Sequence, residues 1–230
     1  MFFIDYWYYI LVVPALILSL LATANVKSTF AKYSAMPSAG GMTGADSARR
    51  ILDENGLYDV RIEPVSGELT DHYDPRSNTI RLSESVYGAQ TAAAVGVAAH
   101  EAGHAVQYAT GYFPIKLRAA MIPVTQIGSN LAMPLVLLGL LLGFEQLAMI
   151  GVIAFSLATL FQLVTLPVEF NASARAVRSL ENSGRMDEAQ IRGTKRVLTA
   201  AALTYVAALA LSLANLLRLF LLVGGRNRRR

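Results

Sequence analysis

Between Ala119 and Val168 the chain reads AAMIPVTQIGSNLAMPLVLLGLLLGFEQLAMIGVIAFSLATLFQLVTLPV, a stretch of 50 residues with one charged residue, Glu145. About 20 apolar residues in a helix are enough to cross the roughly 30 Å hydrocarbon core of a bilayer. Fifty residues are therefore too many for one span and enough for two. Gly143-Phe-Glu-Gln146 is the natural turn between them, so we predict a transmembrane hairpin over residues 119–167.

Two further apolar stretches lie near the ends of the chain. The first, residues 6–24, lacks the basic start and the cleavage site of a signal peptide, so we predict a retained transmembrane helix. The last, residues 199–223, contains an uncharged run from Thr199 to Leu217. With the hairpin, these segments predict four spans. A composition of 54% hydrophobic residues agrees with a membrane protein.

Residues 25–118, between the first span and the hairpin, differ in character because they contain most of the acidic residues. Their patterns alternate between helical and strand-like periods, which predicts a small α+β domain. After the hairpin, residues 168–198 are predicted to form a polar helix and a linker, with a break at Asn182-Ser-Gly184. The elements expected before the hairpin are a helix over 43–56 that begins near Thr43 or Asp46, strands over 60–65 and 79–82, and an alanine-rich helix over 89–109.

The alanine-rich helix contains the motif whose residues could carry out catalysis, Ala98-Ala-His-Glu-Ala-Gly-His-Ala-Val-Gln107. His100 and His104 are four residues apart, so they lie on one face of a helix, where both can bind one zinc ion. Glu101 is then beside the metal without binding it. There it can take a proton from the water that zinc activates and later protonate the leaving amine. The pattern is typical of zinc peptidases, although five residues with three fixed positions also occur by chance.

Two features of the composition support a metal site at this motif. The chain has no cysteine, so a metal must be held by imidazole and carboxylate groups. It has three histidines, of which two are in the motif.

Gly103 within the helix costs about 1 kcal/mol relative to alanine. We therefore expect another backbone, or the metal site itself, to approach the helix closely at Gly103.

A catalytic zinc site needs a third protein ligand. His72 is one candidate and Glu169 is the other. Two spans separate Glu169 from His104, so the chain returns to the side from which it started and Glu169 emerges on the side of the histidine helix. The alternative is an ordinary interfacial acid, paired with Arg175 or Arg178. From the residues alone, both interpretations stay open.

Four segments of the chain together resemble the YugP-like bacterial membrane zinc metallopeptidases, in order and over nearly the whole length. There is also a more distant similarity to the HtpX-like membrane proteases, in which a hydrophobic hairpin precedes a glutamate ligand in the pattern E-x-x-A-D. Here that pattern is Glu169-Phe-Asn-Ala-Ser173, with serine in place of aspartate. The resemblance implies that Glu169 is the third ligand of one Zn²⁺ per chain. The four segments are Leu69–Arg76, Asn78–Ser83, Ala98–Gln107 and Leu166–Ser173.

The resemblance also implies a use for the strand over 79–82. In proteases of this kind an edge strand beside the active site pairs with the extended backbone of the substrate. We therefore expect Thr79, Ile80 and Arg81 to contact substrate. The alternative is that they form a strand with a structural role only.

Three more residues are candidates for supporting roles. His72 and Tyr73 precede the strand and could bind substrate or stabilise the oxyanion, whereas a histidine in a turn is more often simply solvated. Arg175 follows Glu169 by six residues and could orient the carboxylate or balance its charge.

The basic residues near the span ends predict which side of the membrane holds the motif. Eight lie on the motif side and four on the other, which favours a cytoplasmic motif side under the positive-inside rule. We interpret the basic tail over residues 224–230 as a contact with lipid head groups, because no aromatic residues are interleaved as in nucleic-acid binders. The eight are Lys27, Lys32, Lys116, Arg118, Arg175, Arg178, Lys195 and Arg196, and the four are Arg226, Arg228, Arg229 and Arg230.

We therefore predict a mainly α membrane protein with four transmembrane helices and a small α+β, zincin-type catalytic domain with a glutamate ligand. Its expected function is zinc-dependent cleavage of membrane-associated proteins or peptides. One alternative, an intramembrane-cleaving protease, would need an aspartate in the later spans, which have none. Another, a scaffold or assembly factor that retains a metal site, would not need Glu101. A transporter would need more ionisable residues in its spans. No nucleic acid is expected as a partner, and nothing in the sequence indicates an oligomer or a regulatory partner.

Overall fold

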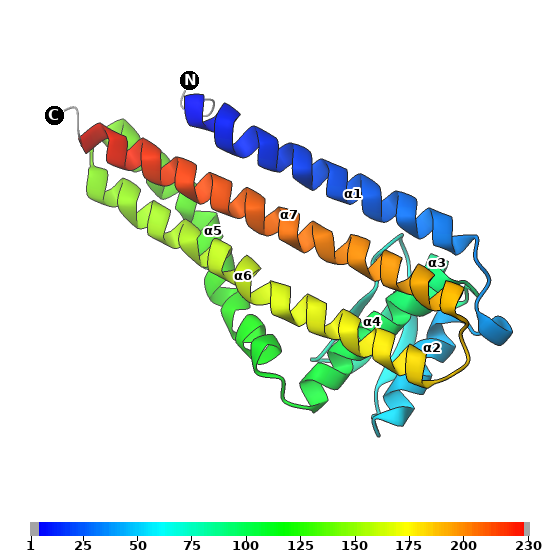
Figure 1. Ribbon diagram of the computed structural model, residues 1–230. Coiled ribbons are helices and arrows are strands. Elements are labelled where there is room, and N and C mark those ends of the chain that lie inside the picture. Colours follow the sequence, from blue (N-terminus) through cyan, green and yellow to red (C-terminus); the bar gives the residue numbers. More distant parts are fainter. Residues whose placement is uncertain (1–4, 228–230) are drawn as a thin grey trace. The chain divides into compact units, whose positions relative to one another are not determined.

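The computed structural model describes residues 5–227, with side chains up to Gly225, and it is mostly helical (Figure 1). Four helical segments are long and apolar enough to cross a membrane, which confirms the number predicted from hydropathy. They are Tyr8–Ser34, Phe113–Leu142, Glu145–Asn182 and Glu188–Gly225. The corresponding helices are α1 (Val13–Ser34, preceded by the π-helical turn Tyr8–Val12), α5 (Phe113–Leu142), α6 (Glu145–Asn182) and α7 (Glu188–Asn227).

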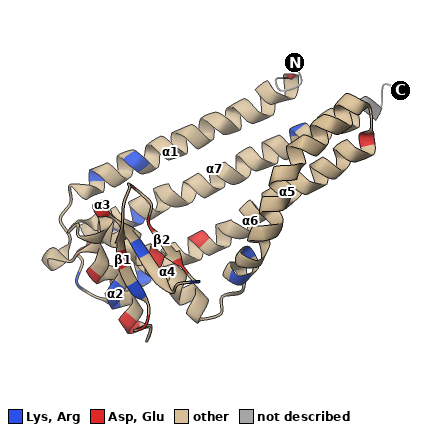
Figure 2. Cartoon of the chain, turned by 180° about the vertical axis from the view of Figure 1, so that it is seen from behind, with Lys and Arg blue, Asp and Glu red and all other residues tan. Residues whose placement is uncertain are grey.

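The chain divides into two compact units, and each of the four long helices contributes to both. The helical unit consists of Met1–Thr23, Leu117–Leu166 and Thr204–Arg230. The mixed unit consists of Ala24–Lys116 and Pro167–Leu203 and contains all the strands. Charged side chains gather on the elements of the mixed unit, whereas the apolar stretches of the long helices have few (Figure 2).

In the helical unit, α5 and α6 form the predicted hairpin. Helix α5 ends at Leu142 and α6 begins at Glu145, with Gly143 between them at a positive φ of 69° that favours glycine. A small apolar cluster joins this hairpin to α7, where Val136 and Val152 pack near Leu219.

The helical unit also contains an ion pair that hydropathy does not reveal. The guanidinium of Arg218 on α7 donates to Oδ2 of Asp5 through Nε at 2.8 Å and through Nη2 at 2.7 Å. It also lies over the ring of Tyr8, 5.1 Å from the centroid. The Arg218 side chain is only 7% exposed, so this pairing compensates a charge that is largely removed from solvent.

Helix α6 is longer than the sequence indicates. We expected the span to end at residue 167 and a separate polar helix to follow, but α6 continues through Pro167 and Glu169 to Asn182. Proline is tolerated inside long apolar helices. The carbonyl of Pro167 itself accepts a hydrogen bond from Tyr112 Oη at 3.4 Å. The break predicted at 182–184 is confirmed, with Gly184 at φ 62°.

The basic tail falls largely outside the described residues. Helix α7 continues through Asn227, whereas Arg228, Arg229 and Arg230, together with the side chain of Arg226, lie beyond what the structure describes. The interpretation of residues 224–230 as a lipid contact therefore stays a prediction.

The first helix of the mixed unit, α2 (Gly44–Glu54), begins where its capping chemistry predicts. Thr43 Oγ1 accepts from the amide of Asp46 at 3.1 Å, and Asp46 Oδ2 accepts from the amide of Thr43 at 3.0 Å. This reciprocal capping box satisfies two amides that a helix start leaves free. Helix α2 packs against α4 (Ala92–Ala109), where Ser47 Oγ donates to the carbonyl of Val95 at 3.2 Å.

The sheet has three strands in the order β1-β3-β2. Strand β3 (Thr79–Ser83) is parallel to β1 (Arg61–Val65) and antiparallel to β2 (His72–Asp74). Ile80 lies opposite Ile62 on one side and opposite Tyr73 on the other. The prediction that residues 79–82 form an edge strand is therefore wrong. Strand β2 has three residues, too few for an alternating pattern to show in the sequence.

Helix α4 is central to the core of the mixed unit. Its alanines are buried against Ile80 and Leu82 of β3 and against Leu52 of α2. On the side of α6, a Cβ added to Gly103 would lie 2.7 Å from the carbonyl oxygen of Ala172. The close approach expected at Gly103 is thus confirmed, and the approaching group is the backbone of α6. The short helix α3 (Glu84–Tyr87) and the 3-10 turn η2 (Ala39–Gly41) complete the unit.

Candidate metal centre

Helices α4 and α6 bring two histidines and one glutamate together within the mixed unit. Nε2 of His100 lies 3.2 Å from Oε2 of Glu169, and Nε2 of His104 lies 3.6 Å from the same oxygen. The ligand atoms of these three residues all lie within 4.8 Å of one another. The helical spacing of four residues places both imidazoles on one face of α4. The close packing at Gly103 brings α6 near enough for Glu169 to reach them.

The donor set and its spacing fit a tetrahedral zinc ion. Zinc bonds of about 2.0–2.2 Å to nitrogen and oxygen set tetrahedral neighbours roughly 3.4 Å apart, close to the 3.2 and 3.6 Å observed. Glu169 is only 2% exposed, and a buried carboxylate needs a compensating charge. A cation between the three side chains would supply it.

A hydrogen bond to the far side of each imidazole orients its Nε2 towards this centre. Gln107 Oε1 lies 3.0 Å from Nδ1 of His104, and since an amide oxygen can only accept, Nδ1 carries the proton. Nδ1 of His100 lies 3.1 Å from Oγ of Ser173, which can accept in the same way. With both Nδ1 atoms engaged, the Nε2 atoms keep their lone pairs for a metal.

Gln107 also connects α4 to α6 at the position of Glu169. Its side chain is fully buried, and Nε2 donates to the carbonyl of Val168 at 2.8 Å and to Oδ1 of Asn171 at 3.0 Å. Asn171 Oδ1 also accepts from Nε of Arg175 at 2.8 Å. A single amide therefore orients His104 and fixes the backbone next to Glu169.

The electrostatics of the centre favour positive charge. Burial lowers the pKa of His104, but the neighbouring Glu169 carboxylate and the charge of Glu101 outweigh it and raise the pKa above its usual value. The same negative surroundings that favour a proton on the imidazole also favour a bound cation.

Glu101, the expected proton-transferring residue, lies on the same helix as the two histidines. It follows His100 on α4 and is 8% exposed. Its carboxylate accepts no hydrogen bond from any residue that the structure describes. The oxygens are therefore free to bind water or a substrate proton.

A second carboxylate, Asp71, lies in the electrostatic neighbourhood of Glu101. Its Oδ1 accepts from the amide of Ser83 at 2.8 Å and from Ser83 Oγ at 3.0 Å. Burial, with a smaller effect from the charge of Glu101, raises the pKa of Asp71. These bonds join the segment before β2 to the end of β3.

His72 and Tyr73 lie on β2, outside the three-residue group. His72 is exposed, and its Nδ1 is 2.8 Å from the carbonyl of Thr70. Tyr73 Oη donates to Oδ1 of Asn78 at 2.8 Å, and its ring contacts that of Tyr108 on α4 at a centroid distance of 5.7 Å. Burial raises the pKa of Tyr73. These contacts place β2 next to the helix of the motif.

The residues expected on the substrate strand have structural contacts in β3. Thr79 and Ile80 are fully buried, and Thr79 Oγ1 donates to the carbonyl of Ser77 at 3.0 Å. Arg81 pairs with Asp74 at 3.3 Å and with Glu63 at 3.7 Å, so it bridges the two outer strands. Their position in the middle of the described sheet corrects the expected edge position, which was the reason for expecting these residues to pair with substrate.

Gln107 and Asn171 are not among the residues predicted from the sequence, and Ser173 has no predicted role. Gln107 ends the quoted motif stretch and follows His104 by three residues, a spacing that places both on one helix face. That spacing was the available signal. Asn171 and Ser173 gave no comparable signal, because their partners on α4 are more than 60 residues away.

The sequence is similar to known proteins over almost its full length. The profile of a family described as "Putative neutral zinc metallopeptidase" matches residues 8–224. A curated relative from Bacillus subtilis (strain 168), "Putative membrane protease YugP", is 50% identical over 218 residues, which cover 94% of this chain and 97% of the relative. No solved structure matches this chain. The matched range of residues 8–224 thus spans both the long apolar helices and the segment that contains His100, His104 and Glu169.

Proposed function

Because this chain belongs to the neutral zinc metallopeptidase family, we propose that it is a membrane-embedded endopeptidase that hydrolyses peptide bonds with one zinc ion. The observation that supports this most strongly is the convergence of His100, His104 and Glu169 within 4.8 Å, with Glu101 next to His100. The first three residues would hold the metal through the two Nε2 atoms and the Glu169 carboxylate. When bound, zinc acts as a Lewis acid that makes water more acidic and polarises a carbonyl group.

Glu101 is the proposed general base and acid. Its carboxylate, free of hydrogen bonds within the described residues, takes a proton from the attacking water. It then delivers that proton to the nitrogen of the leaving amine, so the carboxylate is regenerated at the end of the cycle. Because Glu101 is not a ligand in this scheme, its replacement removes the proton transfer and leaves the metal in place.

The substrate strand is reassigned from β3 to β2 in this proposal. Strand β2 lies at the edge of the described sheet and next to α4. An extended peptide can therefore add to its outer edge, where His72 and Tyr73 are available for contact. Arg81, between Asp74 and Glu63, would hold β2 against the rest of the sheet.

The proposed substrates are membrane-associated proteins or peptides. The mixed unit is built partly from the polar ends of helices that are long and apolar enough to span a membrane, so its substrates are found near the lipid surface. The excess of basic residues around the mixed unit supports a cytoplasmic location for it.

Metal content and proteolysis, measured together, test this proposal. Purified wild type is expected to contain about one zinc ion per chain by mass spectrometry and to cleave casein. Glu169→Ala should lose the zinc, whereas Glu101→Gln should retain zinc and lose cleavage. Wild type without zinc would refute the metallopeptidase, and cleavage by Glu101→Gln would refute the role of Glu101. Retention of zinc by Glu169→Ala would mean that the third ligand is another residue, and His72→Ala would be the next variant to measure.

A further inference from the structure

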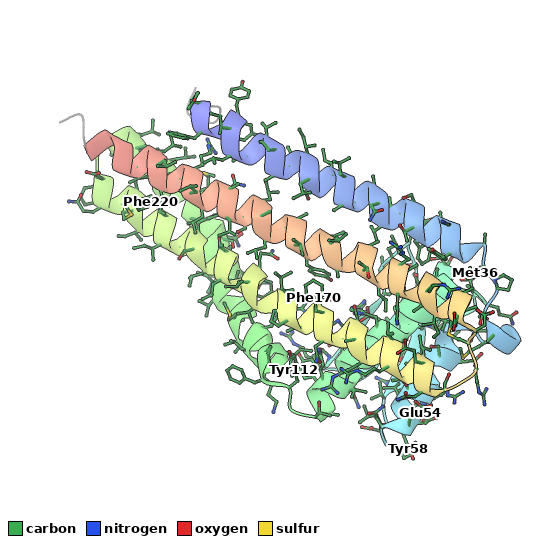
Figure 3. All side chains as sticks on the ribbon, in the orientation of Figure 1. Met36, Glu54, Tyr58, Tyr112, Phe170 and Phe220 are labelled. Atoms are coloured by element: carbon green, nitrogen blue, oxygen red, sulfur yellow. The ribbon has the colours of Figure 1, made fainter. Side chains whose placement is uncertain are left out.

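An open groove of about 400 Å³ lies between α6 and α7 within the mixed unit. The two helices run antiparallel there, and Lys195 on α7 pairs with Glu181 on α6 at 2.6 Å (Figure 1). Phe170, labelled in Figure 3, is on α6 and is 48% exposed. The groove is lined by Phe170, Ser173, Ala174, Val177 and Arg178 of α6 and by Lys195, Leu198, Thr199 and Ala202 of α7.

The groove has an apolar end and a cationic end. From Phe170 to Arg178 along α6 is about 12 Å, and from Ala202 back to Lys195 along α7 is about 10 Å, at 1.5 Å per residue. Phe170 and Ala202 lie next to the apolar runs of their helices. Arg178 and Lys195 lie at the other end, towards the helix connection. Both walls therefore change from apolar to basic in the same direction.

The cationic end can accept an anion. Arg178 is exposed and forms no ion pair with any residue that the structure describes. Its Nε makes one long hydrogen bond, 3.4 Å, to the carbonyl of Ala174. Lys195 is 50% exposed and shares its charge with Glu181. The two bases against one acid leave a net positive charge at this end.

The apolar part of the groove offers little to a peptide backbone. Its polar side chains are Ser173 and Thr199, and Ser173 Oγ is already within hydrogen-bond distance of His100. A bound peptide would bury amide groups without partners, which is costly. A hydrocarbon chain has no such groups, and Phe170, Val177 and Leu198 would surround it with apolar contacts.

We propose that this groove binds one anionic phospholipid, with its phosphate at Arg178 and Lys195 and an acyl chain along Phe170, Leu198 and Ala202. The groove changes from apolar to cationic in the same direction as a lipid changes from acyl chain to head group. Its apolar end adjoins the apolar runs of α6 and α7, and its cationic end adjoins their polar segments. Basic pockets between membrane helices are a known arrangement for anionic head groups. None of the three proposed metal ligands lines the groove, and its contact with them is through Ser173, next to His100. Lipid binding there does not depend on the proposed peptidase activity.

Native mass spectrometry of the full-length protein in detergent tests the proposal, with dioleoyl phosphatidylglycerol and dioleoyl phosphatidylcholine as probes. Wild type should bind the anionic lipid about 5-fold more tightly, from roughly 1 kcal/mol for the one net positive charge at this end. The double variant Arg178→Gln/Lys195→Gln should lose this preference. Arg192→Gln is the matched control, because Arg192 is an exposed base on α7 that pairs with Glu188 and does not line the groove.

The apolar wall is tested separately. Ala174 is exposed on the groove wall, so Ala174→Leu should fill part of it and weaken both lipids about equally, while circular dichroism reports an unchanged fold. An unchanged preference in the double variant, or equal affinity of wild type for the two lipids, would overturn the proposal.

A photo-crosslinking amino acid in place of Ala174 should capture phospholipid in membranes. Capture of a second copy of the chain, or of another protein, would contradict it.

Discussion

Gly103 on α4 and Ala172 on α6 approach so closely that a Cβ on Gly103 would lie 2.7 Å from the Ala172 carbonyl oxygen. This contact is between backbones, so neither side can rotate away as a side chain would. It sets the distance between the helix that carries the two histidines and the helix that carries Glu169. The geometry of the candidate metal centre therefore depends on a residue that is not among its proposed ligands.

We expect Gly103→Ala to separate the two helices at the centre. Overpacking of this kind costs about 1–3 kcal/mol of stability, and a displacement of about 1 Å can lower the catalytic rate by roughly 100-fold. Zinc content and casein cleavage are the measurements. Gly96→Ala, on the same helix, is the matched control, because the atoms nearest to its added Cβ belong to the side chain of Thr194, at 2.8 Å, and not to a backbone. If both variants retain full activity, the contact has no role in placing Glu169.

Gln107→Leu should weaken zinc binding by about 10–100-fold, as expected when a group that orients a ligand is lost. The variant leaves Nδ1 of His104 and the carbonyl of Val168 without the partners that Gln107 supplies. Competition with a chelator measures the affinity. Asn171→Ala is the companion variant, because it removes one partner of Gln107 and keeps the bond to His104, so its effect should be smaller. An effect of Asn171→Ala as large as that of Gln107→Leu would argue against this role of the His104 bond.

Local periodicity in the sequence was enough to predict the spans and the motif. A run of about 20 apolar residues has the length that a helix needs to cross a bilayer, and the spacing of His100 and His104 fixes their common face. A glycine in the middle of a helix also indicated a close approach, which the structure found at Ala172. These are properties of contiguous residues.

Contacts between distant segments could not be predicted in the same way. The bond from Ser173 to His100 and the pairing of β2 with β3 depend on tertiary packing. Strand β2 is too short to show a period, and the edge position expected for residues 79–82 rested on the family resemblance alone. Asp5 and Arg218 are 213 residues apart, and nothing in either neighbourhood indicates the other.

Asp74 should make the stability of the mixed unit depend on pH. The carboxylate of Asp74 accepts hydrogen bonds from the Ser77 hydroxyl and from the amide of Arg76. These bonds lower the pKa of Asp74 to about 2, from a usual 3.8. A lowered carboxyl pKa stabilises the folded state above pH 3.8, and this contribution is lost as the pH falls towards 2. Asp74→Asn should therefore reduce the unfolding temperature at pH 5 and have little effect near pH 2. A difference that is constant from pH 2 to pH 5 would contradict this assignment.

Asp71 should have the opposite effect, which makes Asp71→Asn a useful control. Burial raises the pKa of Asp71, so its folded form holds a proton that the unfolded chain releases as the pH rises above 3.8. Stability from this group therefore falls with rising pH. Relative to wild type, Asp71→Asn should gain stability between pH 4 and the raised pKa, whereas Asp74→Asn should not.

Arg218→Met should destabilise the helical unit by about 3–5 kcal/mol, because it leaves Asp5 without the partner it contacts at 2.7 Å. The double variant Asp5→Leu/Arg218→Met should be more stable than the single one, since both charges are then removed. Thermal unfolding in detergent gives the comparison. If the double variant is less stable than Arg218→Met, the two residues do not act as a pair.

The placement of ligands on both sides of the α5–α6 hairpin has a consequence for biosynthesis. A ribosome delivers the chain from its N-terminus, so His100 and His104 emerge before the hairpin, and Glu169 emerges only after it. With the proposed ligand set, a nascent chain cannot complete its centre until both hairpin helices have been made. With that ligand set, the newly made protein is therefore unable to cleave itself or its neighbours while the α5–α6 hairpin is still being made.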